Sequence, residues 1–168
     1  METNECSLAV ASNEAAARRE WPLPKQREIL VPIDFSEPSV TALRHARTLA
    51  DGQKAHVILL NVVEEPGSFR TMDAVGQRRV RFEQRAERLQ ALADRELGPK
   101  VATRIEVREG KPATEITRLA SRRHVDLIVV GQHSHRGLWR WVQGHTASKL
   151  SKTAPCPVLL LKGGHRLN

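Results

Sequence analysis

Short apolar runs alternate with amphipathic segments along most of the chain. The apolar runs predict strands over residues 28–33, 55–63, 103–107, 125–130 and 157–161. The segments between them predict helices from Ser36 to Asp51-Gly52, over about 73–97, after Pro112, and near 146–152. This alternation predicts an α/β fold, in which a parallel sheet carries helices on both faces. In such sheets ligands bind beyond the carboxyl ends of the strands.

The pattern also divides the chain into three parts. Residues 1–26 have no sustained period and end in a proline-rich hinge, so we expect a flexible N-terminal arm. Residues 27–163 hold all the predicted elements and form one domain, and residues 164–168 are a short tail. The first residues are acidic and do not resemble a secretory signal, and no apolar run is long enough to span a bilayer. With only two cysteines, we expect a cytoplasmic protein without disulfide bonds.

Positive charge gathers in the last part of the chain. The formal net charge is +8, and the segment from Gly131 onward holds six Lys and Arg residues and no acidic residue. This segment starts with a glycine at a strand end and leads to Gly144, which precedes a predicted helix. Glycines and a helix N-terminus in this arrangement are typical of loops that hold phosphate groups. An anionic ligand and a merely solvated basic surface both fit the charge.

Five short motifs in order resemble the universal stress protein family. They are ILVPIDFSE at residues 29–37, LNVVE at 60–64, GKP at 110–112, DLIVVG at 126–131 and PCPVLL at 155–160. The resemblance covers nearly everything except the arm. It implies a Rossmann-like, open five-stranded parallel sheet of the universal stress protein type. It also implies a homodimer that pairs through the last strand.

Members that bind ATP carry a glycine, two residues, a second glycine, nine residues, and a third glycine followed by serine or threonine. Here Gly131 and Gly144 match, whereas Ser134 replaces the second glycine and His145 replaces the hydroxyl residue. The resemblance implies a nucleotide site of Pro32, Ile33, Asp34, Val62, Gly131 and Gly144, with Val62 against the adenine. Loop residues His133, Ser134, Arg136, His145 and Thr146 complete the expected site. A serine at a position that needs a positive φ costs about 1 kcal/mol, so any ATP binding that is retained is expected to be weak.

Two functions remain open from the sequence. One is a nucleotide-responsive homodimer in stress response or signalling, and the alternative is a nucleotide-free dimeric interaction module. Asp34 either contacts the nucleotide or caps the following turn. We expect no enzymatic activity, because no nucleophile, base and orienting residue can be grouped. The loop histidines match no zinc pattern, and no nucleic-acid-binding motif accompanies the charge, so neither a metal nor a nucleic acid is expected.

Overall fold

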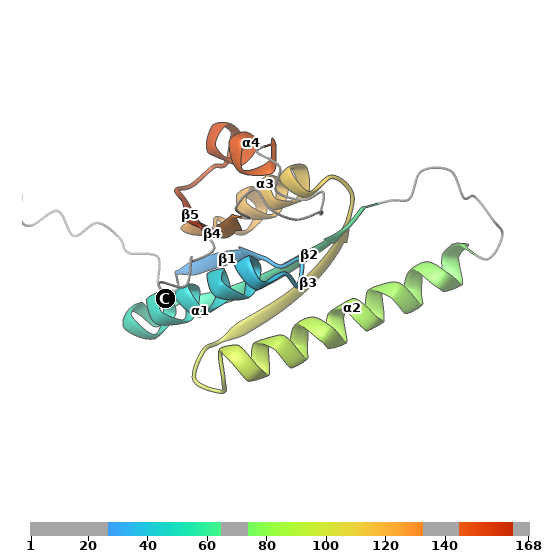
Figure 1. Cartoon of the computed structure of the whole chain (residues 1–168), viewed down its shortest axis with the longest axis horizontal. Coiled ribbons are helices and arrows are strands. Elements are labelled where there is room, and N and C mark those ends of the chain that lie inside the picture. Colours follow the sequence, from blue (N-terminus) through green and yellow to red (C-terminus); the bar gives the residue numbers. More distant parts are fainter. Residues whose placement is uncertain (1–26, 65–73, 133–144, 163–168) are drawn as a thin grey trace, which may run out of the picture.

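The computed structural model describes residues 27–64, 74–132 and 145–162, and forms five strands and four helices there (Figure 1). The strands are β1 (Glu28–Pro32), β2 (His56–Val63), β3 (Thr103–Glu109), β4 (Leu127–Gln132) and β5 (Val158–Lys162). The helices are α1 (Glu37–Gln53), α2 (Ala74–Glu96), α3 (Pro112–Arg123) and α4 (His145–Thr153). The expected arm and tail lie outside the described residues. No described helix is long and apolar enough to cross a membrane.

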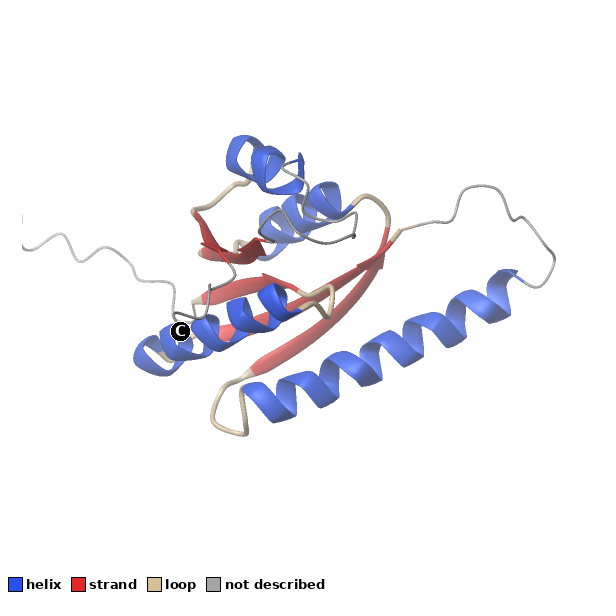
Figure 2. Ribbon diagram, in the orientation of Figure 1, coloured by secondary structure: helices blue, strands red, loops and turns tan. Residues whose placement is uncertain are grey.

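All five strands pair in parallel, in the order β3-β2-β1-β4-β5. The sheet therefore winds outward in two directions from the middle, and its direction reverses between β1 and β4. Helices cover both faces (Figure 2), as expected when right-handed crossovers run in two opposite directions along one sheet. The predicted α/β fold with a five-stranded parallel sheet is confirmed. Strand β3 is one edge of the sheet, and β5 is the other.

Each face of the sheet has its own hydrophobic core. One core joins the strands to α1 and α2 through residues such as Val31, Leu59, Leu43, Leu89 and Val129. The other joins them to α3 and α4 through residues such as Leu30, Leu60, Leu119, Ile128 and Leu150. Because side chains alternate along a strand, neighbouring residues of one strand belong to opposite cores.

Helix α1 begins as predicted and ends later than predicted. Ser36 is its N-cap, and its side chain accepts a hydrogen bond from the Ser39 N–H. The expectation that Asp51-Gly52 closes the helix is wrong, because Gly52 remains within α1. Lys54 takes the left-handed conformation instead, with φ of 52°, and its N–H donates to the Ala50 carbonyl. That bond satisfies one of the carbonyl groups left open at the end of the helix.

Candidate functional site

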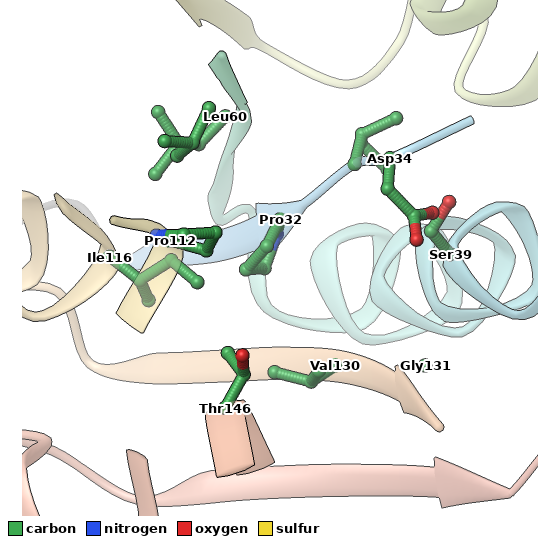
Figure 3. Close-up of a pocket in the computed structure, with 11 residues that line it drawn as sticks. Pro32, Asp34, Ser39, Leu60, Pro112, Ile116, Val130, Gly131 and Thr146 are labelled. Atoms are coloured by element: carbon green, nitrogen blue, oxygen red, sulfur yellow. The ribbon is translucent and has the colours of Figure 1, made fainter. Parts of the chain in front are cut away.

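A pocket opens at the carboxyl ends of β1, β2 and β4, where the winding of the sheet reverses (Figure 3). Its volume is about 430 Å³, including the open space at its mouth. The lining residues are Pro32, Ile33, Asp34, Ser39, Leu60, Val62, Pro112, Ile116, Val130, Gly131 and Thr146. The pocket therefore has the mainly apolar lining and the position that small-molecule sites have in α/β sheets.

One wall of the pocket is the edge of β2 that β1 leaves uncovered. The register of β1 with β2 ends at the pair Pro32 and Leu60, and just beyond it the Ile33 N–H donates to the Leu60 carbonyl at 2.8 Å. Strand β2 continues to Val63. The N–H and C=O groups of a strand point to alternate sides, so those of Val62 point the same way as those of Leu60. Val62 thus presents a donor and an acceptor on the side where β1 has ended, beside the apolar pocket.

Hydroxyl and carboxylate groups line another side of the pocket. The Asp34 Oδ1 accepts hydrogen bonds from the Ser36 N–H at 3.0 Å and from the Ser36 hydroxyl. The Ser39 hydroxyl donates to the Ser36 carbonyl at 2.9 Å. Asp34 and Ser39 lie on the same side in Figure 3. Asp34 therefore closes the turn before α1, which is one of the two roles that the sequence left open, and it also lines the pocket. Its contact with a nucleotide stays a prediction.

Gly131 brings α1 against the end of β4. A Cβ atom built on Gly131 would overlap the Pro38 carbonyl group and lie 2.8 Å from the Ser39 nitrogen. The expected reason for this glycine was close approach of a phosphate. The structure gives a different reason, because the backbone at the start of α1 already fills the space that a side chain would need.

The structure brings together six of the predicted site residues. Pro32, Ile33, Asp34, Val62, Gly131 and Thr146 all line the pocket, although β1, β2, β4 and α4 are far apart in sequence. Thr146 lies in the first turn of α4 and is half-buried, and His145 is the first residue of that helix. The other predicted residues, His133, Ser134, Arg136 and Gly144, lie outside the described residues.

Five lining residues were not predicted as part of the site. They are Ser39, Leu60, Pro112, Ile116 and Val130. Leu60 could have been found by alternation, because it shares a strand face with Val62. Val130 could have been found from its position at the carboxyl end of β4. Pro112 and Ile116 lie four residues apart in α3, which follows the carboxyl end of β3. That spacing puts both on one helix face.

Cys156 lies between α4 and β5, directly before Pro157. It is half-buried and packs against the core under α3 and α4. Burial raises the pKa of the Cys156 thiol, and the negative charge of Asp126 raises it further. A raised pKa keeps the thiol protonated at neutral pH, which fits a packing role.

The chain matches known proteins over the region that forms this fold. The model of the universal stress protein family matches residues 26–162. The chain belongs to the universal stress protein family. Universal stress protein MJ0531 from Methanocaldococcus jannaschii is 33% identical over 143 residues, covering 81% of this chain and 82% of the relative. Universal stress protein YxiE from Bacillus subtilis is 32% identical over 145 residues, covering 80% of this chain and 98% of the relative.

Solved structures of universal stress proteins have the same fold. Protein MJ0577, also from M. jannaschii, is 26% identical with a TM-score of 0.66, covering 83% of this chain and 97% of the other. A universal stress protein in complex with cAMP has a TM-score of 0.56 at 17% identity, with coverage of 80% and 96%. A family protein from Arabidopsis thaliana with AMP bound has a TM-score of 0.55 at 19% identity, with coverage of 82% and 92%. At these identities the last two show the fold alone.

Proposed function

We propose that this universal stress protein binds an adenine nucleotide in the pocket and acts as a homodimer in stress response or signalling, without a chemical step of its own. The proposal rests mainly on the main-chain edge of Val62, by which we mean its N–H and C=O groups on the side where β1 has ended. Adenine offers an acceptor at N1 next to a donor at N6, and Val62 offers a donor next to an acceptor. The apolar lining around Pro32, Val62 and Val130 suits the faces of a purine ring.

The rest of the nucleotide would extend toward the hydroxyl groups and the start of α4. Asp34 and Ser39 lie where a ribose could be held, and Thr146 offers a hydroxyl within the first turn of α4. A helix N-terminus favours phosphate groups, and the six cations that follow Gly131 add positive charge. The complexes of relatives with cAMP and with AMP support adenine as the base.

A homodimer would form through β5. This strand is an edge of the sheet, and Leu159 and Leu160 are 37% and 38% exposed in the described structure. Pairing with a second copy would cover both the open backbone edge and these leucines. Light scattering tests this proposal, and a monomer at micromolar concentration would contradict it.

The alternative is a nucleotide-free dimeric module that acts through protein contacts. The observation that favours it is the motif itself, in which Ser134 and His145 stand where ATP-binding members have glycine and a hydroxyl residue. Replacing both, as Ser134→Gly with His145→Ser, restores the pattern. If the site takes a triphosphate, the restored protein binds ATP more tightly than the wild type. Equal or weaker binding would favour the nucleotide-free module.

Calorimetric titration of the full chain with ATP, AMP, cAMP and GTP tests the proposal. We expect saturable binding of the adenine nucleotides. Guanine carries a donor at N1 and an acceptor at O6, which reverses the adenine pattern and opposes donor to donor at Val62. We therefore expect GTP to bind about 10- to 100-fold more weakly than ATP. No binding of any adenine nucleotide would overturn the proposal, and equal binding of GTP would exclude the main-chain edge of Val62 as the base-recognising element.

A further inference from the structure

Glu115 is a buried carboxylate that the proposed nucleotide site does not use directly. It is 6% exposed and lies in the first turn of α3, three residues after Pro112 and directly before Ile116. Both of these neighbours line the pocket, whereas Glu115 does not. Buried carboxylates are rare in proteins unless they are paired, because burying a charge is costly.

The Glu115 carboxylate is paired on both sides. One oxygen contacts the Arg118 guanidinium, one turn further along α3, and the other lies 3.9 Å from Arg108 Nη1. Arg108 is on β3, where it is the register partner of Val62. Glu115 therefore joins the first turn of α3 to the strand beside the proposed base-recognising edge.

The Glu115 stem also packs against the turn that leads into α3. A Cβ atom on Gly110 would lie 3.3 Å from the Glu115 Cγ, and Gly110 has a φ of 139°, which only glycine adopts readily. The Gly110 N–H donates to the Val63 carbonyl at 3.0 Å, which ties this turn to the end of β2. Glu115 thus fills the space between the turn, α3 and β3.

We propose that Glu115 is a positioning residue for the pocket. By holding the first turn of α3 against β2 and β3, it fixes Pro112 and Ile116 opposite Val62. It thereby sets the width of the apolar slot, by which we mean the part of the pocket between these three residues. The inference rests on the proposed function for its ligand, because the slot is the part of the pocket that would take the adenine ring. The positioning itself can be tested without a ligand.

The structure offers a matched control in Glu106. This carboxylate accepts from Arg108 at 3.4 Å and from Arg123 at 3.1 Å, so it belongs to the same ionic network. It lies on β3 and does not line the pocket. Glu106→Gln therefore perturbs the same arginine without touching the first turn of α3.

Amide hydrogen exchange of the ligand-free protein is the first measurement. In Glu115→Gln we expect about tenfold faster exchange at the backbone amides of Gly110 and of residue 115. The reason is that the charge-assisted contact of the carboxylate with Arg118 is lost. The Val125 amide, which bonds the Ala120 carbonyl at the far end of α3, reports general loosening and is expected not to change. Unchanged exchange at Gly110, or equally faster exchange in Glu106→Gln, would overturn the inference. If Glu115→Gln does not fold, Arg118→Met removes the half-exposed partner and is expected to accelerate the same two amides.

ATP titration of the same variants is the second measurement, at a temperature where all of them are folded. We expect Glu115→Gln to raise the Kd about tenfold and Glu106→Gln to leave it within about twofold of the wild type. Faster exchange with an unchanged Kd would overturn the link to the pocket. If the wild type binds no adenine nucleotide, the proposed function fails, while the exchange pattern still decides whether Glu115 positions α3.

Discussion

The two faces of the sheet differ most at the carboxyl ends of the strands. On the side of α1 and α2 the described residues close this edge, because Phe35 packs against the core and the Asn61 amide donates to the Ile33 carbonyl at 2.7 Å. Under α3 and α4 the same strands leave a pocket, lined by Leu60 and Val62 on either side of Asn61. Adjacent residues of β2 therefore have opposite roles. The same strands border both faces, so the composition of the strands alone does not provide space for a ligand. The space depends on how closely a helix approaches the strand ends on each face.

The largest expected loss of stability follows from a substitution at Gly131, where the start of α1 meets the end of β4. Gly131→Ala places a methyl group where the Pro38 backbone lies, so either α1 or β4 has to move. We expect a loss of about 3 kcal/mol in the free energy of unfolding, at the upper end for overpacking. Urea denaturation measures this loss.

The control is Gly52→Ala in α1, where nothing lies within 4 Å of the added Cβ atom and the helix continues. Alanine there is expected to stabilise the protein by about 0.5–1 kcal/mol. A small cost at Gly131 would show that α1 is free to move away from the sheet.

The second prediction concerns the amide that closes the same face. Asn61 is 2% exposed, and Asn61→Leu leaves the Ile33 carbonyl without this donor. We expect a loss of about 1.5 kcal/mol, because an unpaired buried carbonyl is costly. Asn61→Asp has nearly the same shape but presents an oxygen to that carbonyl, so we expect a larger loss, on the order of 3 kcal/mol. Thermal or urea unfolding compares the two, and equal losses would mean that volume rather than the hydrogen bond matters at this position.

The strands, their parallel pairing and about half of the pocket could be predicted from the sequence. Buried parallel strands are continuous apolar runs, and their alternation with helices specifies the crossover fold. The family resemblance placed Pro32, Ile33, Asp34, Val62 and Gly131 in one expected site, and Thr146 was added as a loop residue. All six line the pocket. Most of these residues could be grouped because they lie at or just beyond strand ends, which the topology of the sheet brings together whatever their distance in sequence.

The remaining features depend on how helices lie against the sheet, which periodicity does not specify. The part that Pro112 and Ile116 take in the pocket follows from the angle of α3, and the close contact at Gly131 follows from the approach of α1. The end of α1 was also misplaced, because an isolated glycine within a helix and a glycine at its C-cap look alike in sequence. Lys54 adopts the left-handed conformation in its place.

The third prediction concerns a smaller contribution to stability, from the contact between the Phe35 ring and the arginines of α2. Phe35 has a φ of 65°, and the Arg88 guanidinium carbon lies 4.0 Å from the centre of its ring, with Arg85 at 5.6 Å. In a double-mutant cycle of Phe35→Leu with Arg88→Met, we expect a coupling of about 0.5–1 kcal/mol. The more distant pair of Arg78 and Phe82, at 5.5 Å, is the control and is expected to couple less. Equal coupling in both pairs would show that α2 does not specifically hold the turn after β1.

The smallest effect is electrostatic and joins α1 to α2 on the closed face. The hydrogen bond from Arg44 to Glu96, at 2.9 Å, is the main cause that holds the pKa of the Glu96 carboxyl below its usual value of 4.5, and Arg95 lowers it further. Because the folded protein prefers the ionised carboxylate, this contribution is fully present above pH 4.5 and is lost as the pH falls through the lowered folded value. We therefore expect wild type to be slightly more stable than Glu96→Gln at pH 7, with the gap closing as the pH falls toward 3. Arg44 is half-exposed, so the gap is also expected to shrink in high salt. Urea denaturation across this pH range measures the gap. A gap that is the same at pH 7 and at pH 3 would assign the effect of Glu96→Gln to packing rather than to the ion pair with Arg44.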